Sequence, residues 1–310
     1  MKRAIIFLKS LIKGLLTYLN ISTSYDSSSD SDEGTTRKIS ARYCYSVWMR
    51  HLVLADKNNL NSNPKKVGEL GPGDSLGSGL AALLSGAENY KAFDVVQYAS
   101  IKRNLKIFDE LVVLFQNREP IPDDNEFPKV KPFLDNYDFP HHILTEKRLN
   151  ASLDKNRINN IRNELKNSLK GSSYIQYMVP WFDKNVIEKN SLDLVFSQAV
   201  MEHVEDIEST YRSMNAWLKK GAYISHQIDF KSHGITYNWN GHWTYSDFMW
   251  KVIKGKRLYF INRATYSDHL RSIKSSSFKI VDEIPIYKKS EIQRYNLAKR
   301  FKSMTDNDLN

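Results

Sequence analysis

A bare turn between two apolar segments limits the fold of this chain more than any other feature. Residues 66–96 read KVGELGPGDSLGSGLAALLSGAENYKAFDVV, so an apolar run enters a glycine- and proline-rich loop and an alanine- and leucine-rich segment leaves it. We expect a strand at 66–70, a helix at 76–85 and a strand at 90–95. A strand that passes directly into a helix aims the positive helix end at the turn, where a ligand with acceptor atoms can bind.

The spacing of the glycines separates two classes of ligand. Gly71 and Gly73 allow positive φ and close approach of a ligand, and Gly77 would let the helix pack tightly on the strand. A dinucleotide site places its third glycine three residues after the second, whereas Gly77 follows Gly73 by four. Glu69 would repel a diphosphate but attract a cationic amino acid group. Asp94 ends the next strand, where a carboxylate can accept both hydroxyls of a ribose. The turn therefore predicts a nucleoside ligand with an amino acid tail.

Strands and helices alternate along the rest of the chain, which is typical of a largely parallel sheet covered on both faces. The residues at 219–221, KKG, read as the basic last turn and glycine stop of one of these helices. The segment 118–142 holds five prolines and predicts an irregular insertion. We expect four further helices, at 37–59, 101–115, 153–169 and 204–218. We expect four further strands, at 174–178, 192–197, 222–228 and 278–284.

The stretch ELGPGDSLGSG, with Asp94 and the later run SLDLVFSQAVMEHVED, resembles the class I S-adenosylmethionine-dependent methyltransferases over roughly residues 64–230. The resemblance implies an α/β fold that is Rossmann-like and doubly wound, with a mostly parallel seven-stranded sheet, and S-adenosyl-L-methionine as cofactor. It assigns the glycine turn to the methionine part of the cofactor and Asp94 to its ribose. Many relatives carry an aspartate after the third strand for the adenine, but this chain reads YIQYMVPWF, so Gln176 or a backbone carbonyl would replace it. The implied cofactor-binding residues are Glu69, Gly71, Pro72, Gly73, Asp94, Gln176 and Gln198.

Methyl transfer to a hydroxyl needs alignment and a base near the carboxyl ends of the strands. The fifth strand delivers HQIDFKSHG, so His226, Asp229 and His233 are candidates, with the aspartate orienting a histidine. The resemblance adds His203. Each histidine also has a structural alternative, in which His226 points into a helix layer, His233 caps a turn and His203 satisfies its own backbone. A metal held by His226, Asp229 and His233 is a further alternative, but we predict none because nothing fixes their geometry.

The region 230–260 is rich in aromatic residues and contains the run YNWNGHWTYSDFMW at 237–250. It predicts either a stacking surface for a sugar ring or nucleobase, or an aromatic subcore beneath a long loop. The interleaved Asn238, Asn240 and His242 favour a polyhydroxylated ligand.

Residues 1–20, MKRAIIFLKSLIKGLLTYLN, predict a basic amphipathic helix. Lys9 and Lys13 interrupt its apolar run, which excludes a membrane span and a signal peptide core. The helix then lies at a membrane surface or docks on this protein or a partner. Residues 21–36 are rich in serine and aspartate and predict a flexible linker, which leaves 37–310 as the methyltransferase domain. Cys44 is the only cysteine, so a disulfide framework is excluded and a reducing, cytoplasmic setting is expected.

Three functions of different classes fit these observations. The first is methylation of a small-molecule acceptor at a hydroxyl of a sugar or lipid-linked glycan, by an enzyme that is cytoplasmic or peripheral at the membrane. The second is RNA methylation, which the net charge of +10 favours. Against it, the basic residues are scattered among acids and no RNA-binding module is recognisable. The third is a non-catalytic binding module with a methyltransferase fold, which the intact turn disfavours.

Overall fold

The computed structural model describes residues 1–19, 39–167, 173–181 and 187–310, and the predicted linker at 21–36 lies outside them. The chain divides into two compact units, each of which is described by itself. The sheet unit consists of Ile39–Val200 and Arg212–Gln227. The second unit consists of Met1–Lys38, Met201–Tyr211 and Ile228–Asn310.

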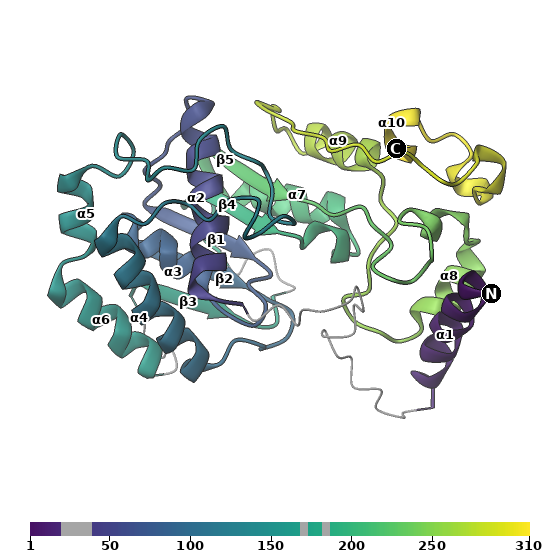
Figure 1. Cartoon of the computed structure of the whole chain (residues 1–310), viewed down its shortest axis with the longest axis horizontal. Coiled ribbons are helices and arrows are strands. Elements are labelled where there is room, and N and C mark those ends of the chain that lie inside the picture. Colours follow the sequence, from purple (N-terminus) through teal and green to yellow (C-terminus); the bar gives the residue numbers. More distant parts are fainter. Residues whose placement is uncertain (20–38, 168–172, 182–186) are drawn as a thin grey trace. The chain divides into compact units, whose positions relative to one another are not determined.

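The sheet unit is an α/β fold around five parallel strands (Figure 1). The strands are β1 (Lys66–Leu70), β2 (Asn89–Phe93), β3 (Ile175–Met178), β4 (Leu192–Gln198) and β5 (Leu218–Gln227). Their order is β3-β2-β1-β4-β5, so the chain starts in the middle, moves to one edge and then returns to build the other. This is the order of a doubly wound sheet, in which ligands bind beyond the carboxyl ends of the central strands.

Helices alternate with these strands as the sequence predicted, and their ends agree within a few residues. The α-helices are α1 (Lys2–Leu16), α2 (Ala41–Lys57), α3 (Gly77–Leu84), α4 (Ile101–Asn117), α5 (Glu146–Ser152), α6 (Lys155–Lys166), α7 (Ile207–Trp217), α8 (Asp247–Lys254), α9 (Tyr266–Ser275) and α10 (Asp306–Leu309). The short 3-10 helices are η2 (Met201–His203), η3 (Gly241–Thr244), η4 (Arg294–Asn296) and η5 (Lys299–Phe301). The segment 118–142 has no helix or strand, as expected for a proline-rich insertion.

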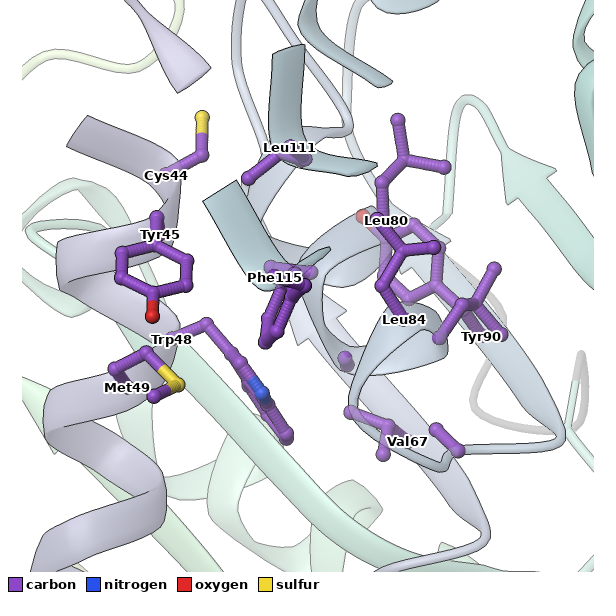
Figure 2. Packing of buried hydrophobic residues seen from close by; sticks show 14 of the residues in the cluster. Cys44, Tyr45, Trp48, Met49, Val67, Leu80, Leu84, Tyr90, Leu111 and Phe115 are labelled. Carbon is purple, nitrogen blue, oxygen red and sulfur yellow. The ribbon is translucent and has the colours of Figure 1, made fainter. Parts of the chain in front are cut away.

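The main core lies between one face of the sheet and the helices α2, α3 and α4. Figure 2 shows side chains from all three helices meeting those of β1 and β2. Trp48 of α2 is buried, and its indole N–H donates to the Ser85 hydroxyl at 2.7 Å. Burial of this apolar surface supplies most of the stabilisation of the sheet unit, and it fixes the direction in which β1 leads into α3.

The opposite face of the sheet packs on the last turn of α7. Phe93 of β2 stacks on Trp217 with 4.9 Å between ring centroids, and both side chains are fully buried. Trp181 completes the cluster with its edge toward Trp217 at 5.5 Å. The sheet is therefore covered on both faces, as the alternation of elements predicted.

Two sequence predictions about the sheet are wrong. The strand expected at 278–284 does not form, and the described residues form five strands, so the predicted seven are not confirmed. That segment is exposed, with Val281 at 53% and Ile284 at 51%, so its apolar residues do not pack on a sheet. The residues KKG do not end a helix either. They lie inside β5, where Gly221 has a φ of +81° and the register with β4 shifts.

In the second unit, α1 lies beside α8 (Figure 1). Gly14 permits this contact, because a Cβ there would meet the Val252 carbonyl oxygen at 2.1 Å. Ser10 donates to the carbonyl of Ile235 at 3.1 Å, and Phe7 contacts the Tyr245 ring. The helix thus docks through small residues of its polar arc together with Phe7 and Leu11, rather than through its whole apolar face. Among the described residues, none of the helices combines the length and apolar character that crossing a bilayer requires.

Candidate functional site

The glycine turn after β1 uses the conformational freedom of two of its glycines. Gly71 has a φ of +59° and Gly73 a φ of +67°, a region that favours glycine. A Cβ at Gly71 would meet the Val200 side chain at 2.7 Å, so this glycine allows close packing within the protein. A Cβ at Gly73 would meet no atom within 4 Å, so Gly73 borders open space where a ligand can approach the backbone. Pro72 between them is buried.

The first amides of α3 are bonded to protein groups. Leu76 N–H donates to Asn104 Oδ1 at 3.0 Å, and Gly77 N–H donates to the Ser75 hydroxyl at 3.0 Å. Sequence reasoning expected these amides to be left for a ligand and missed Asn104, which α4 supplies from a distant part of the chain. Within the turn, the open side therefore lies at Gly73 rather than at the helix itself.

The tight packing predicted for Gly77 lies against helices and not against a strand. A Cβ at Gly77 would meet Cys44 Sγ of α2 at 2.3 Å and the Ile107 side chain of α4 at 2.9 Å. The glycine that packs on the sheet is Gly79, where a Cβ would meet the Tyr90 ring of β2 at 1.9 Å. Both glycines seat α3 closely, which fixes the position of the turn that precedes it.

Asp94 lies beside the glycine turn, directly after β2. Its Oδ2 accepts the N–H of Gly73 at 3.2 Å, and its Oδ1 accepts the N–H of Val95 at 2.8 Å. The residue is 5% exposed, and burial raises the pKa of its carboxyl although these amides lower it in part. The structure therefore brings together Gly73 and Asp94, which the sequence placed on neighbouring loops.

Glu69 is bonded within the protein. It is 4% exposed and accepts the Tyr90 hydroxyl at 2.5 Å. Burial raises its pKa to about 8, the Tyr90 hydroxyl and the Gly79 amide oppose the rise, and the charge of Asp94 adds to it. Glu69 pairs with Ala92 in the register of β1 and β2, two residues before Asp94, so both acids lie at the same end of the sheet. The carboxyl group of Glu69 is thus mostly protonated at neutral pH, and it holds α3 against β2.

Gln198 ends β4 at the same edge, and its Nε2 donates to Gln227 Oε1 at 2.6 Å. Its own Oε1 is buried without a hydrogen-bond partner among the described residues. His51 of α2 lies close by, with Nδ1 2.7 Å from the Ser225 hydroxyl. Burial lowers the pKa of His51 to about 4, although Gln198 opposes part of this decrease. His51 was missed in the sequence because nothing in α2 distinguishes it from a structural histidine.

Gln176 does not lie near the glycine turn. Its side chain is exposed and lines a hollow of about 120 Å³ with Lys66, Asn89 and Lys91, at the beginnings of β1 and β2. The adenine contact expected of Gln176 is therefore not supported. The reason is the alternation along β3, which sends Gln176 and Tyr177 to opposite faces of the sheet.

The four residues expected as catalytic fall into different units. His226 belongs to the sheet unit, where its Nδ1 lies 2.7 Å from the Ser197 hydroxyl across the β4–β5 pair. His203, Asp229 and His233 belong to the second unit, where the rings of His203 and His233 meet edge to face with centroids 5.3 Å apart. His233 Nε2 lies 3.7 Å from Asp229 Oδ2, which is too long for a hydrogen bond.

The aromatic run at 237–250 is divided between core and surface. Trp243 and Trp250 are buried in two small apolar clusters of the second unit. Tyr237 and Phe248 are exposed, at 53% and 75%. His242 is buried beside Trp243, and burial lowers its pKa to about 3. The tryptophans of the run thus form the subcore that the sequence offered as one of two alternatives.

Comparisons with known proteins give a match to part of this chain. A family model described as a methyltransferase domain matches residues 149–225, which include β3, β4 and most of β5 but not the glycine turn. No curated protein matches the chain.

Among solved structures, the chain is similar to a proposed sarcosine dimethylglycine methyltransferase from Galdieria sulphuraria, with 12% identity and a TM-score of 0.40 over 74% of this chain and 60% of that one. It is also similar to phosphoethanolamine N-methyltransferases 1 and 2 from Haemonchus contortus. The first has 15% identity and a TM-score of 0.29 over 60% of this chain and 26% of that one. The second has 12% identity and a TM-score of 0.36 over 78% of this chain and 43% of that one. This chain thus spans less than two thirds of the length of each of these proteins.

The matched segment covers the later strands of the sheet. Gly73 and Asp94 lie before it, and their likeness to this family rests on the sequence motif and on the hydrogen bond between them. Residues 149–225 thus match a methyltransferase domain, and the parallel sheet of this unit has the doubly wound strand order that the sequence predicted.

Proposed function

We propose that this protein transfers a methyl group from S-adenosylmethionine to a hydroxyl of a small-molecule acceptor, namely a sugar or a lipid-linked glycan. The observation that carries the cofactor part is the pairing of Gly73 with Asp94. A buried carboxylate accepts the amide of a glycine that has positive φ and open space beside it. A nucleoside with hydroxyl donors fits such an edge, because the carboxylate can accept from a ribose while the bare backbone lets the ligand come close.

S-adenosylmethionine supplies a methyl group on a positively charged sulfur. The acceptor oxygen attacks the methyl carbon, the carbon–sulfur bond breaks, and the sulfur keeps the electron pair as a neutral thioether. The hydroxyl proton leaves to a base, so charge and atoms balance. The residues of this chain then have two tasks, which are to hold cofactor and acceptor in line and to receive that proton.

Cofactor binding is tested by calorimetric titration of the full chain with S-adenosylhomocysteine. The variant Asp94→Asn should bind at least tenfold more weakly, which is about 1.4 kcal/mol. Asp193→Asn is a matched control, because Asp193 Oδ2 also accepts two backbone amides, those of Lys65 and Lys66 at 2.9 and 2.8 Å, at the other end of the sheet. It should lose stability but keep its affinity. Equal affinity in both variants would refute the site.

The acceptor is tested by incubating the protein with radiolabelled S-adenosylmethionine and separated cell fractions. Label in sugars or glycolipids supports the proposal. Label in RNA, retained only at low salt, would favour the RNA alternative that the net charge of +10 suggests. Binding of S-adenosylhomocysteine without label in any fraction would favour a non-catalytic module.

We also propose that α1 contacts an anionic membrane surface. An apolar stripe along the helix remains 46–67% exposed although the helix docks on α8, and it consists of Ile5, Leu8, Ile12, Leu15 and Leu19. The exposed lysines Lys2, Lys9 and Lys13 lie beside this stripe, and their charge favours anionic lipid.

Sedimentation with vesicles that contain phosphatidylserine tests this contact. Leu8→Glu should reduce binding at least fivefold, because it places a charge in the stripe away from the α8 contact. Val113→Glu, at a 51% exposed position of α4, is the control and should bind as the natural chain does. Equal binding of all three proteins would remove the support for membrane contact.

A further inference from the structure

A cluster of metal-ligating side chains lies in the second unit, around the 3-10 helix η2. Glu202, His203 and His233 each offer one ligand atom, and these atoms all lie within 4.8 Å of one another. Glu202 and His203 come from η2, whereas His233 comes from a turn where its backbone has a φ of +47°. This group was not predicted from the sequence, which considered His226 and Asp229 with His233.

Glu202 is the group in this cluster that most needs a partner. The residue is 4% exposed, and neither carboxylate oxygen has a hydrogen-bond partner among the described residues. A buried carboxylate without partners is costly unless a proton or a cation neutralises it.

His203 is held in place by a hydrogen bond from one of its ring nitrogens. Its Nδ1 lies 2.6 Å from the carbonyl oxygen of Tyr259, which can only accept, so Nδ1 carries the proton. The other nitrogen, Nε2, therefore keeps its lone pair in the neutral ring. A backbone carbonyl that fixes the tautomer in this way is common behind histidines that bind metals.

His233 supplies the third ligand atom, and Asp229 adds negative charge. His233 Nε2 is buried and has no hydrogen-bond partner among the described residues. Asp229 Oδ2 lies 3.7 Å from it, and Asp229 Oδ1 accepts the N–H of Lys231 at 3.0 Å. The surroundings of the cluster thus combine two imidazoles with two carboxyl groups, which suits a doubly charged cation.

We propose that Glu202, His203 and His233 bind a divalent transition-metal ion, such as Zn²⁺, Mn²⁺ or Fe²⁺. Two imidazoles and one carboxylate are typical ligands of these ions, whereas Ca²⁺ and Mg²⁺ prefer oxygen ligands only. Ligand atoms about 2.0–2.2 Å from an ion lie about 3–3.5 Å apart. The cluster is within 4.8 Å, so small side-chain rotations bring the three atoms to bonding distance. The remaining coordination positions are left for water or an oxygen ligand.

This site does not depend on methyl transfer, and it gives two of the predicted bases another role. While an ion is bound, the lone pairs of His203 and His233 are used in coordination and cannot accept a proton. It also explains why a buried carboxylate without a hydrogen-bond partner in the described part of the chain is retained at Glu202. Binding of the ion to the folded chain alone would stabilise the protein by mass action.

The test uses the full chain, freed of any histidine tag and stripped with a chelator, titrated separately with Zn²⁺, Mn²⁺ and Co²⁺. We expect one ion per chain, and a visible absorption spectrum for bound Co²⁺. Glu202→Gln keeps the shape of the side chain, and His233→Asn keeps a residue that tolerates positive φ. Each should weaken binding at least tenfold and change the Co²⁺ spectrum.

His141→Asn is the matched control, since His141 is exposed and lies in the sheet unit. It should bind metal as the natural chain does, and circular dichroism should show that all three variants are folded. The proposal is overturned if no ion binds more tightly than about 1 mM, or if Glu202→Gln and His233→Asn bind as tightly as the control. Affinity for S-adenosylhomocysteine reports on the cofactor site separately.

Discussion

The open space beside Gly73 gives the sharpest test of the cofactor site. Gly73→Ala places a methyl group where no atom lies within 4 Å, so the substitution causes no clash inside the protein. Its cost to stability comes from the φ of +67°, and a left-handed alanine costs about 1–2 kcal/mol. If the space belongs to the cofactor, the same methyl group also blocks the ligand, and affinity for S-adenosylhomocysteine should fall at least tenfold.

Gly221→Ala separates the two effects. Gly221 has a φ of +81°, and a Cβ there would likewise meet no atom within 4 Å, but it lies in β5 among exposed residues. It should lose the same 1–2 kcal/mol or so in urea unfolding and retain its affinity in calorimetry. The reasoning fails if Gly73→Ala and Gly221→Ala bind the ligand equally well at matched stability.

Three further predictions concern the sheet unit. Glu69 has a pKa of about 8 when folded, so the folded state binds more protons than the unfolded state above the ordinary carboxyl pKa of 4.5, and stability falls as pH rises toward 8. The slope is about 1.4 kcal/mol per pH unit for this group. Urea unfolding at several pH values should show that the free energy of unfolding of Glu69→Gln falls less steeply with pH than that of the natural chain, by about that slope. Equal slopes for the two proteins would contradict the assignment. Trp217→Ala should lower the free energy of unfolding by about 3–5 kcal/mol, because it removes the buried ring that stacks on Phe93. A loss below about 1 kcal/mol in urea unfolding would argue against that packing. His226→Ala, which removes the ring held by Ser197, should lower kcat at least a hundredfold and leave affinity for S-adenosylhomocysteine unchanged, measured with an acceptor from the fraction screen. An unchanged kcat would exclude His226 as the base.

Local sequence patterns predicted most of the sheet unit. The glycine turn set the passage from β1 to α3, and alternating apolar segments located β2, α4, β3 and β4 within a few residues. These patterns work because each depends on neighbours within a few residues. The prediction of a strand at 278–284 is wrong because the pattern there is also only local. An apolar run forms a strand only if a sheet edge lies beside it.

The candidate site was less accessible to sequence reasoning. The pairing of Gly73 and Asp94 could be expected, since carboxyl ends of adjacent parallel strands share an edge. The side chain of Asn104 at the start of α3 could not, because it comes from another helix. The adenine contact expected of Gln176 is not supported, because a shift of one residue along a strand decides which face of the sheet a side chain lies on.

The sequence by itself determined the turn and the order of the elements of the sheet unit, since backbone conformation and spacing are local properties. Only the tertiary structure decided which buried acids are protonated and which distant side chains lie together. Glu69 becomes a mostly neutral group because the surrounding core buries it, and this effect outweighs the opposing hydrogen bond from Tyr90. Glu202 and His233 meet although 31 residues separate them in the chain. Burial and long-range contact set the energy of a charge, and neither can be read from a residue's neighbours in the sequence.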